Sequence, residues 1–140
     1  MDDIRATLSC KNIDIFICVE SWFHSLHDSD AISINEYVCF RADRIGRVGG
    51  GVAIWIRENY PVTVLPCDAP RGLECLAVKL PVFRLILFAV YLPPNIASRT
   101  SHSHCLNDFF VSCLDRALDS CPDYGIIFAG DLNRFNILCL

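Results

Sequence analysis

The chain has 140 residues, which is enough for one domain with a buried core. Its composition, 53% hydrophobic and 20% charged, favours a packed globular fold and disfavours disorder. A net charge of −4 argues mildly against nucleic-acid binding, because proteins that bind nucleic acids usually carry a basic surface.

Two segments bear on where the protein resides. The longest apolar stretch, residues 82–92, contains Arg84 and is shorter than the roughly 20 residues of a membrane-spanning helix. The N-terminal segment begins with acidic residues and lacks the apolar region of a signal peptide. The nine cysteines are odd in number and include no CxxC pair, which favours reduced thiols. We therefore expect an intracellular protein, nuclear or cytoplasmic, that is neither secreted nor bound to a membrane.

The first half of the chain reads as apolar runs separated by turns. Residues 3–11 predict a short helix, since Ile4 and Leu8 are four positions apart. Continuous apolar runs of four to eight residues are typical of strands buried on both faces. The run 13–19 predicts such a strand. Further strands are predicted at 37–40 and 52–57, with a polar loop at 24–36 and a glycine-rich connection at 41–51.

The second half adds strands at 61–65, 73–80, 83–92 and 125–129. The short connection between the second and third of these predicts an antiparallel hairpin. Residues 93–104 are predicted to form a loop, in which Ser101 or Ser103 caps the next helix.

That helix is predicted from apolar residues recurring at three- and four-residue steps between Leu106 and Leu118, and Pro122 marks its end. Strands that follow one another without helices argue against a purely parallel sheet. The sequence therefore predicts one domain, residues 1–140, of α/β or α+β class, with layered sheets and a helix packed outside.

Polar or aromatic residues follow three of the predicted strands. Glu20 follows the run 13–19, Tyr91 closes a later run, and Asp131 and Asn133 follow 125–129. Strand ends that converge on one edge of a sheet are where α/β proteins place ligands. A carboxylate there can hold Mg²⁺. Asp131 could accept a proton or orient water, and Asn133 could donate a hydrogen bond to a phosphate oxygen.

Each feature also has an ordinary structural interpretation. A glutamate at a strand end is usually solvated, and Asp-x-Asn commonly forms an Asx turn. The run Gly49–Gly51 is typical of a permissive turn. Arg41, Arg44 and Arg47 are compatible with a solvated loop. Taken singly, none of these features favours a functional site over the ordinary interpretation.

Together and in order, the motifs resemble a known family. They are the segments DIFICVESW (14–22), FRADR (40–44), GGGVAIWIR (49–57), Leu73-Glu74, VYLPPN (90–95) and IFAGDLN (127–133). This series is similar to the endonuclease/exonuclease/phosphatase class, also described as AP-endonuclease-like. It is most like the endonuclease domain of non-LTR (LINE-type) retrotransposon reverse transcriptase polyproteins.

The resemblance implies a partial four-layer α/β/β/α sandwich of the DNase I-like type. It also implies Mg²⁺-dependent hydrolysis of a DNA phosphodiester, with endonuclease nicking, and a reverse-transcriptase domain in the same polyprotein. By the same resemblance, Glu20 would hold the metal and Asp131 would activate the attacking water. Tyr91 and Asn133 would donate to the scissile phosphate.

Three further residues are implied as contacts to the substrate. Asn95 would help to position the phosphate, and Arg41 and Arg44 would contact the DNA backbone, with Arg47 a further candidate.

The chain departs from the family pattern at both ends. The opening strand with its Asn, and the later Asp and His, have no counterpart, and Arg134-Phe-Asn-Ile replaces the usual small residue and His. We therefore expect a domain truncated at both ends that is weak or inactive alone. The alternatives are a phosphoinositide or sphingomyelin phosphodiesterase of the same fold, a non-catalytic retroelement remnant, and an ordinary α/β binding domain.

Overall fold

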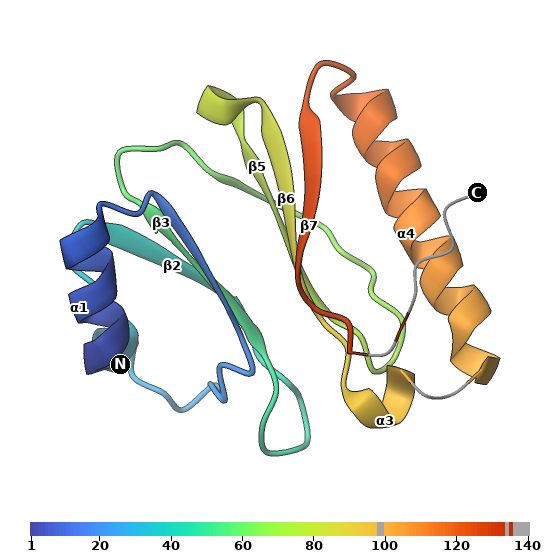
Figure 1. The fold of residues 1–140 in the computed structure, drawn as a ribbon, viewed down its shortest axis with the longest axis horizontal. Helices are drawn as coiled ribbons and strands as arrows, with labels where there is room; N and C mark the ends of the chain where they lie inside the picture. The colour runs from blue at the N-terminus through green and yellow to red at the C-terminus, as the bar shows by residue number, and fades with distance from the viewer. Residues whose placement is uncertain (98–99, 134, 136–140) are drawn as a thin grey trace.

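The computed structural model describes residues 1–97, 100–133 and 135. Two β-sheets lie face to face, with α1 (Asp2–Lys11) outside the first and α4 (Thr100–Ser120) outside the second (Figure 1). The layers therefore follow the order helix, sheet, sheet, helix, which confirms the predicted fold class. Among the described residues, none of the helices combines the length and the apolar character needed to cross a membrane.

The first sheet contains β1 (Ile15–Val19), β2 (Tyr37–Ala42) and β3 (Val52–Arg57), in the order β1-β3-β2. Both pairings are antiparallel. Side chains of a strand point alternately to its two faces. In β3, Ile54 packs toward the second sheet, whereas Trp55 packs against Leu8 of α1. Ile4 joins the same contact, as the helical period of α1 predicted.

The second sheet contains β4 (Thr63–Leu65), β5 (Glu74–Leu80), β6 (Leu85–Tyr91) and β7 (Gly125–Asp131), in that order. The predicted hairpin of β5 and β6 is confirmed, with the 3₁₀ turn η1 (Pro81–Phe83) at its tip. β7 runs parallel to β6, and α4 is part of the crossover between them (Figure 1).

Burial along β6 shows how the second sheet is shared between two cores. Phe88 and Val90 pack toward α4, whereas Leu87, Ala89 and Tyr91 pack toward the first sheet. Because all of these side chains are buried, β6 is the central strand on which both cores rest. Its last residue, Tyr91, is thereby held at the edge where the two sheets meet.

Two predicted connections contain helices. The segment 93–104, predicted as a loop, contains α3 (Pro94–Ala97) and the first turn of α4. Ser101 and Ser103 therefore lie inside α4, and the prediction that one of them caps it is wrong. The apolar period starts only at Leu106, where the helix reaches the core, so the polar first turn gave no signal. Similarly, the predicted loop 24–36 contains α2 (Ser29–Ile32).

The prediction that β1 is buried on both faces is also wrong. All five of its residues are only partly buried. The reason is its position, since β1 pairs with β3 alone and lies at the edge of the first sheet.

The same isoleucine-to-alanine substitution should have very different effects on stability in the core between the sheets and at an exposed position. Ile54 has no exposed surface, whereas Ile45 is 95% exposed. Ile54→Ala should lower the free energy of unfolding by about 2–5 kcal/mol, because it leaves a cavity between the sheets. Ile45→Ala should change it by less than about 0.5 kcal/mol. Urea unfolding followed by tryptophan fluorescence measures both, and equal losses would contradict the two-sheet core.

Candidate active site

Glu20 is the first residue after β1, and its backbone conformation directs its side chain. Along β1, Val19 packs toward the second sheet and Cys18 toward α1, so strict alternation would turn Glu20 to the α1 side. Instead Glu20 has a φ of 53°. Its carboxylate accepts hydrogen bonds from the Tyr91 hydroxyl at Oε1 and from Trp22 Nε1 at Oε2, the latter at 3.2 Å. The break in alternation therefore joins the end of β1 to the end of β6.

This conformation is held in place by the glycines before β3. Both Glu20 and Trp22 are left-handed, with φ of 53° and 58°. A left-handed residue other than glycine costs on the order of 1–2 kcal/mol. Two backbone hydrogen bonds offset that cost: Ser21 N–H donates to the Gly51 carbonyl at 3.2 Å, and Trp22 N–H donates to the Gly50 carbonyl at 2.8 Å. Such strain is often located at functional sites.

Gly50 is required by a close approach. A Cβ at this position would lie 2.3 Å from the guanidinium carbon of Arg44, and its φ is 74°. Only glycine permits both the conformation and the contact. The Gly49–Gly51 run, for which a permissive turn was the ordinary interpretation, therefore also makes room for the Arg44 side chain.

Three polar side chains form a row across the second sheet. Glu74 is the first residue of β5, Tyr91 the last of β6 and Asp131 the last of β7. In the strand register, Tyr91 pairs with Glu74 on one side and with Asp131 on the other. Paired residues project to the same face of a sheet, and Tyr91 projects toward the first sheet. The row therefore lies on the inner face, at the edge where Glu20 reaches Tyr91.

Burial and hydrogen bonding fix the charge states in this group. Burial, followed by the hydrogen bond to Glu20, raises the pKa of Tyr91 to about 12, so the phenol remains protonated and donates. The hydrogen bonds from Tyr91 and then Trp22 lower the pKa of Glu20, so its carboxylate is charged at neutral pH.

Asp131 is positioned by Gly130 and by an Asx turn. A Cβ on Gly130 would lie 1.8 Å from the Val90 carbonyl oxygen, so only glycine lets β7 run this close to β6. Asp131 Oδ1 accepts from the Asn133 N–H, and Asn133 Nδ2 donates to the Leu92 carbonyl, both at 2.7 Å. Asp131 therefore forms an Asx turn and also lies beside Tyr91. One amide hydrogen of Asn133 is already used.

Arg44 and Glu74 form a half-buried ion pair beside this group. Arg44 Nε donates to one oxygen of Glu74, and the Gly51 N–H donates to the other. The side chains are 22% and 13% exposed, respectively. The Arg44 guanidinium carbon also lies 5.8 Å from the centre of the Tyr91 ring. Arg44, predicted to contact DNA, is therefore largely committed to contacts within the protein.

No role for Glu74 was predicted, although a signal for one was present. The motif Leu73-Glu74 was noted only for its family resemblance. Because β5 and β6 form a hairpin, a turn placed at Pro81–Phe83 sets the register that pairs Glu74 with Tyr91.

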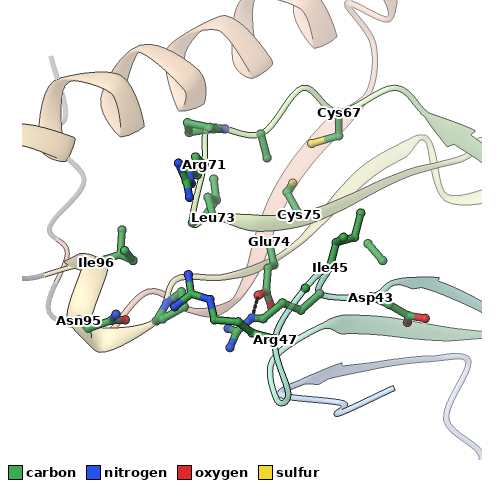
Figure 2. A pocket seen from close by; sticks show the side chains of 17 residues that line it. Asp43, Ile45, Arg47, Cys67, Arg71, Leu73, Glu74, Cys75, Asn95 and Ile96 are labelled. Atoms are coloured by element: carbon green, nitrogen blue, oxygen red, sulfur yellow. Dashed lines mark hydrogen bonds and ion pairs between the residues drawn. The ribbon is translucent and has the colours of Figure 1, made fainter. Parts of the chain in front are cut away.

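Of the remaining residues that were predicted to contact the substrate, Arg47 and Asn95 line a neighbouring cleft. The cleft has a volume of about 690 Å³ and is lined in part by Arg44, Arg47, Arg71, Glu74 and Asn95 (Figure 2). Arg41 instead lies on β2, with its guanidinium 3.5 Å from the carboxylate of Asp43. Neither Glu20 nor Asp131 lines the cleft. The Arg44–Glu74 pair forms the boundary between the cleft and the row around Tyr91.

The site suits a hard cation that takes few protein ligands. Among the described residues, no three His, Cys, Asp or Glu side chains are grouped to hold a metal ion. Mg²⁺ commonly binds through one or two carboxylates together with water and substrate phosphates. Glu20 has a charged carboxylate at an exposed position, so it is suited to this kind of binding.

No protein-family model and no curated protein matches the sequence, but solved structures do. Truncated TDP2 from Caenorhabditis elegans is 17% identical with a TM-score of 0.62, covering 94% of this chain and 53% of that chain. The 3′-5′ exonuclease NExo from Neisseria meningitidis is 17% identical with a TM-score of 0.63, covering 93% and 51%. ANGEL2, a 2′,3′-cyclic phosphatase, is 15% identical with a TM-score of 0.62, covering 95% and 43%.

This chain has the DNase I-like fold. It spans about half the length of the solved chains that it matches. Among the described residues, β7 is one of the two edge strands of the second sheet, and Ile127 on it is 47% exposed. Asp131 thus lies at the exposed end of an edge strand, whereas Tyr91 beside it is buried.

The Arg44–Glu74 pair predicts a specific loss of stability. Glu74→Gln should lower the free energy of unfolding by about 1.5–3 kcal/mol, because a neutral amide cannot replace the charged acceptor of Arg44 and Gly51. Glu58→Gln is the matched control, since Glu58 is exposed and forms no ion pair among the described residues. Urea unfolding measures both variants. Equal effects, or no energetic coupling with Arg44→Met in a double-mutant cycle, would contradict the assigned pair.

Proposed function

We propose that this domain hydrolyses a phosphodiester bond of DNA with Mg²⁺ as its cofactor, as a retrotransposon-type nicking endonuclease. The observation that carries the proposal is the convergence of Glu20, Tyr91 and Asp131. They come from the ends of three strands in two sheets: the Tyr91 hydroxyl donates to Glu20, and Tyr91 pairs with Asp131 in the strand register. The motifs FRADR and VYLPPN favour the retrotransposon type, for which we also propose a reverse-transcriptase domain in the same polyprotein.

The proposed roles follow from the charge states of the residues. Glu20 is charged at neutral pH and would hold the cation. Bound Mg²⁺ supplies positive charge that stabilises the negative charge developing on the phosphate oxygens. Tyr91 stays protonated, so its hydroxyl can be redirected from Glu20 to a phosphate oxygen.

Asp131 and Asn133 are proposed to act on the attacking water and the phosphate. Asp131 Oδ1 is occupied by the Asn133 N–H, and its other oxygen accepts no hydrogen bond from the described residues. That second oxygen is therefore available to orient water and accept its proton. The second hydrogen of the Asn133 amide, which does not bind Leu92, could donate to the phosphate.

The cleft supports a nucleic-acid substrate despite the net charge of −4. Arg47 and Arg71 are exposed on its lining and form no ion pair among the described residues. Guanidinium groups bind phosphates through paired hydrogen bonds. We therefore propose that Arg47 and Arg71, with Asn95, contact the DNA backbone. Arg41 and Arg44 are held by Asp43 and Glu74 and are proposed to have secondary roles.

Binding of Mg²⁺ at Glu20 predicts a change in tryptophan emission. Trp22 is 58% exposed and donates to Glu20, whereas Trp55, the other tryptophan, is fully buried. Coordination of the Glu20 carboxylate should disturb the Trp22 hydrogen bond and alter its emission. A titration with MgCl₂ should therefore saturate and should be reversed by EDTA.

Glu20→Gln should abolish this response, and Trp22→Phe should remove the signal. Asp119→Asn is the matched control, because Asp119 is an exposed acid on α4, and it should leave the midpoint unchanged. A response with the same midpoint in Glu20→Gln would show that Mg²⁺ binds elsewhere.

Activity on DNA is tested by the conversion of supercoiled plasmid to open circles with Mg²⁺. The rate of this conversion is measured for the wild-type chain. Asp131→Asn should lower this rate about 10²–10⁴-fold, since the amide cannot accept a proton. Glu58→Gln should leave it unchanged. Nicking that survives Asp131→Asn would contradict the proposed role.

The same preparation distinguishes the alternatives. Plain duplex DNA, abasic duplex DNA and phosphoinositides should be compared as substrates at equal concentration. Preferential hydrolysis of a phosphoinositide would assign the site to another phosphodiesterase type of this fold. Mg²⁺ binding at Glu20 without hydrolysis of any substrate would support a non-catalytic remnant.

A further inference from the structure

Cys67 and Cys75 are brought together by the connection between two paired strands. Cys67 follows β4, and Cys75 is the second residue of β5, which pairs antiparallel with β4. Both side chains line the cleft, and their sulfur atoms point toward one another from opposite ends of the intervening segment (Figure 2). Each residue is partly buried and is a free cysteine.

The two thiols also interact chemically. The hydrogen bond from the Cys75 thiol lowers the pKa of Cys67, and the positive charge of Arg116 contributes in the same direction. The same hydrogen bond, followed by burial, raises the pKa of Cys75. Cys67 is therefore the more readily ionised member, and Cys75 holds its proton. A thiolate next to a second thiol is the arrangement of a reactive dithiol.

Other cysteines differ from this pair. Burial raises the pKa of Cys18 and Cys113, and it raises the pKa of Cys39 to about 11. These three thiols are thus kept protonated and weakly nucleophilic. Reactivity should be concentrated at Cys67, because its thiol faces that of Cys75 in the cleft (Figure 2) and its pKa is lowered.

We propose that Cys67 and Cys75 form a reversible disulfide and so constitute an oxidation site on the wall of the cleft. The oxidant is a low-molecular-weight disulfide such as oxidised glutathione. The Cys67 thiolate attacks one sulfur of the oxidant, which breaks its S–S bond and releases one glutathione thiolate. That thiolate takes a proton. Cys75 then loses its proton to solvent and attacks the Cys67 sulfur, which releases the second glutathione. Two protein thiols are oxidised, and one glutathione disulfide is reduced to two thiols.

The disulfide would enclose the segment between the two cysteines, which carries Arg71 and Leu73 into the cleft. A disulfide restricts the conformations of the residues that it encloses. Because Cys75 adjoins Glu74, oxidation would also fix the strand end that holds Arg44. The proposal concerns thiol chemistry and does not depend on phosphodiesterase activity.

The sequence offers a direct test by mass spectrometry. Trypsin cleaves after Arg57, Arg71 and Lys79, so Cys67 and Cys75 fall in separate peptides, 58–71 and 72–79, each with a single cysteine. The native 140-residue protein is incubated with oxidised glutathione, blocked with N-ethylmaleimide and digested. The expected result is a cross-linked pair of these peptides with a mass two hydrogens below their sum, lost on treatment with dithiothreitol.

Variants decide the chemistry. Cys75→Ser should convert the cross-link into a persistent glutathione adduct on Cys67, and Cys67→Ser should remove the cross-link and leave Cys75 as a thiol. Cys105→Ser is the matched control, because Cys105 is exposed on α4, and it should leave the yield unchanged. In the wild type, Cys67 should react with the oxidant about tenfold faster than Cys105.

Three results obtained with the folded protein would overturn the proposal. They are a wild-type protein without the 58–71/72–79 cross-link, a stable glutathione adduct on wild-type Cys67, and an equal yield of cross-links between other cysteine pairs. Retention of the cross-link at the same yield in protein unfolded by urea would also overturn it, because the pairing would then owe nothing to the fold.

Discussion

The hydrogen bond between the Tyr91 hydroxyl and the Glu20 carboxylate is the interaction on which the candidate site depends. It joins the end of β6, buried between two cores, to the end of β1, an edge strand of the other sheet. Glu20 can make it only because a left-handed φ turns its side chain away from the α1 face. The bond also affects the chemistry, since it lowers the pKa of Glu20 and adds to the effect of burial, which raises the pKa of Tyr91.

Two close approaches of the backbone make this geometry possible. Gly50 leaves room for the Arg44 side chain, which then holds Glu74, and Gly130 lets β7 lie against β6 so that Asp131 pairs with Tyr91. A methyl group at either glycine would clash, so each is a steric requirement of the site. The same arrangement separates two environments, with an anionic rim at Glu20 and Asp131, and a cleft with exposed arginines beyond the Arg44–Glu74 pair.

The sequence predicted those parts of the structure that depend on a local sequence pattern. Apolar runs located the strands, and the short connection predicted at Pro81-Val82 located the hairpin, whose turn is Pro81–Phe83 in the structure. The start of α4 was missed because residues 100–103 are polar in sequence, and the partial burial of β1 followed from a strand order that no local pattern encodes. The convergence of Glu20, Tyr91 and Asp131 was expected from strand ends. The commitment of Arg44 to Glu74 joins two residues that are 30 positions apart, which no local pattern gives.

We propose that these strand ends surround one cation. Mn²⁺ can replace Mg²⁺ and broadens the NMR signals of nearby nuclei, so a titration of isotope-labelled protein with Mn²⁺ locates the ion directly. We expect the amide signals of Glu20, Tyr91 and Asp131 to broaden together at the lowest Mn²⁺ concentrations. Asp119 and Asp123, exposed acids near the opposite end of β7, should be unaffected at that stage. Broadening that begins at Asp119 and Asp123, or that reaches Glu20 without Asp131, would contradict it.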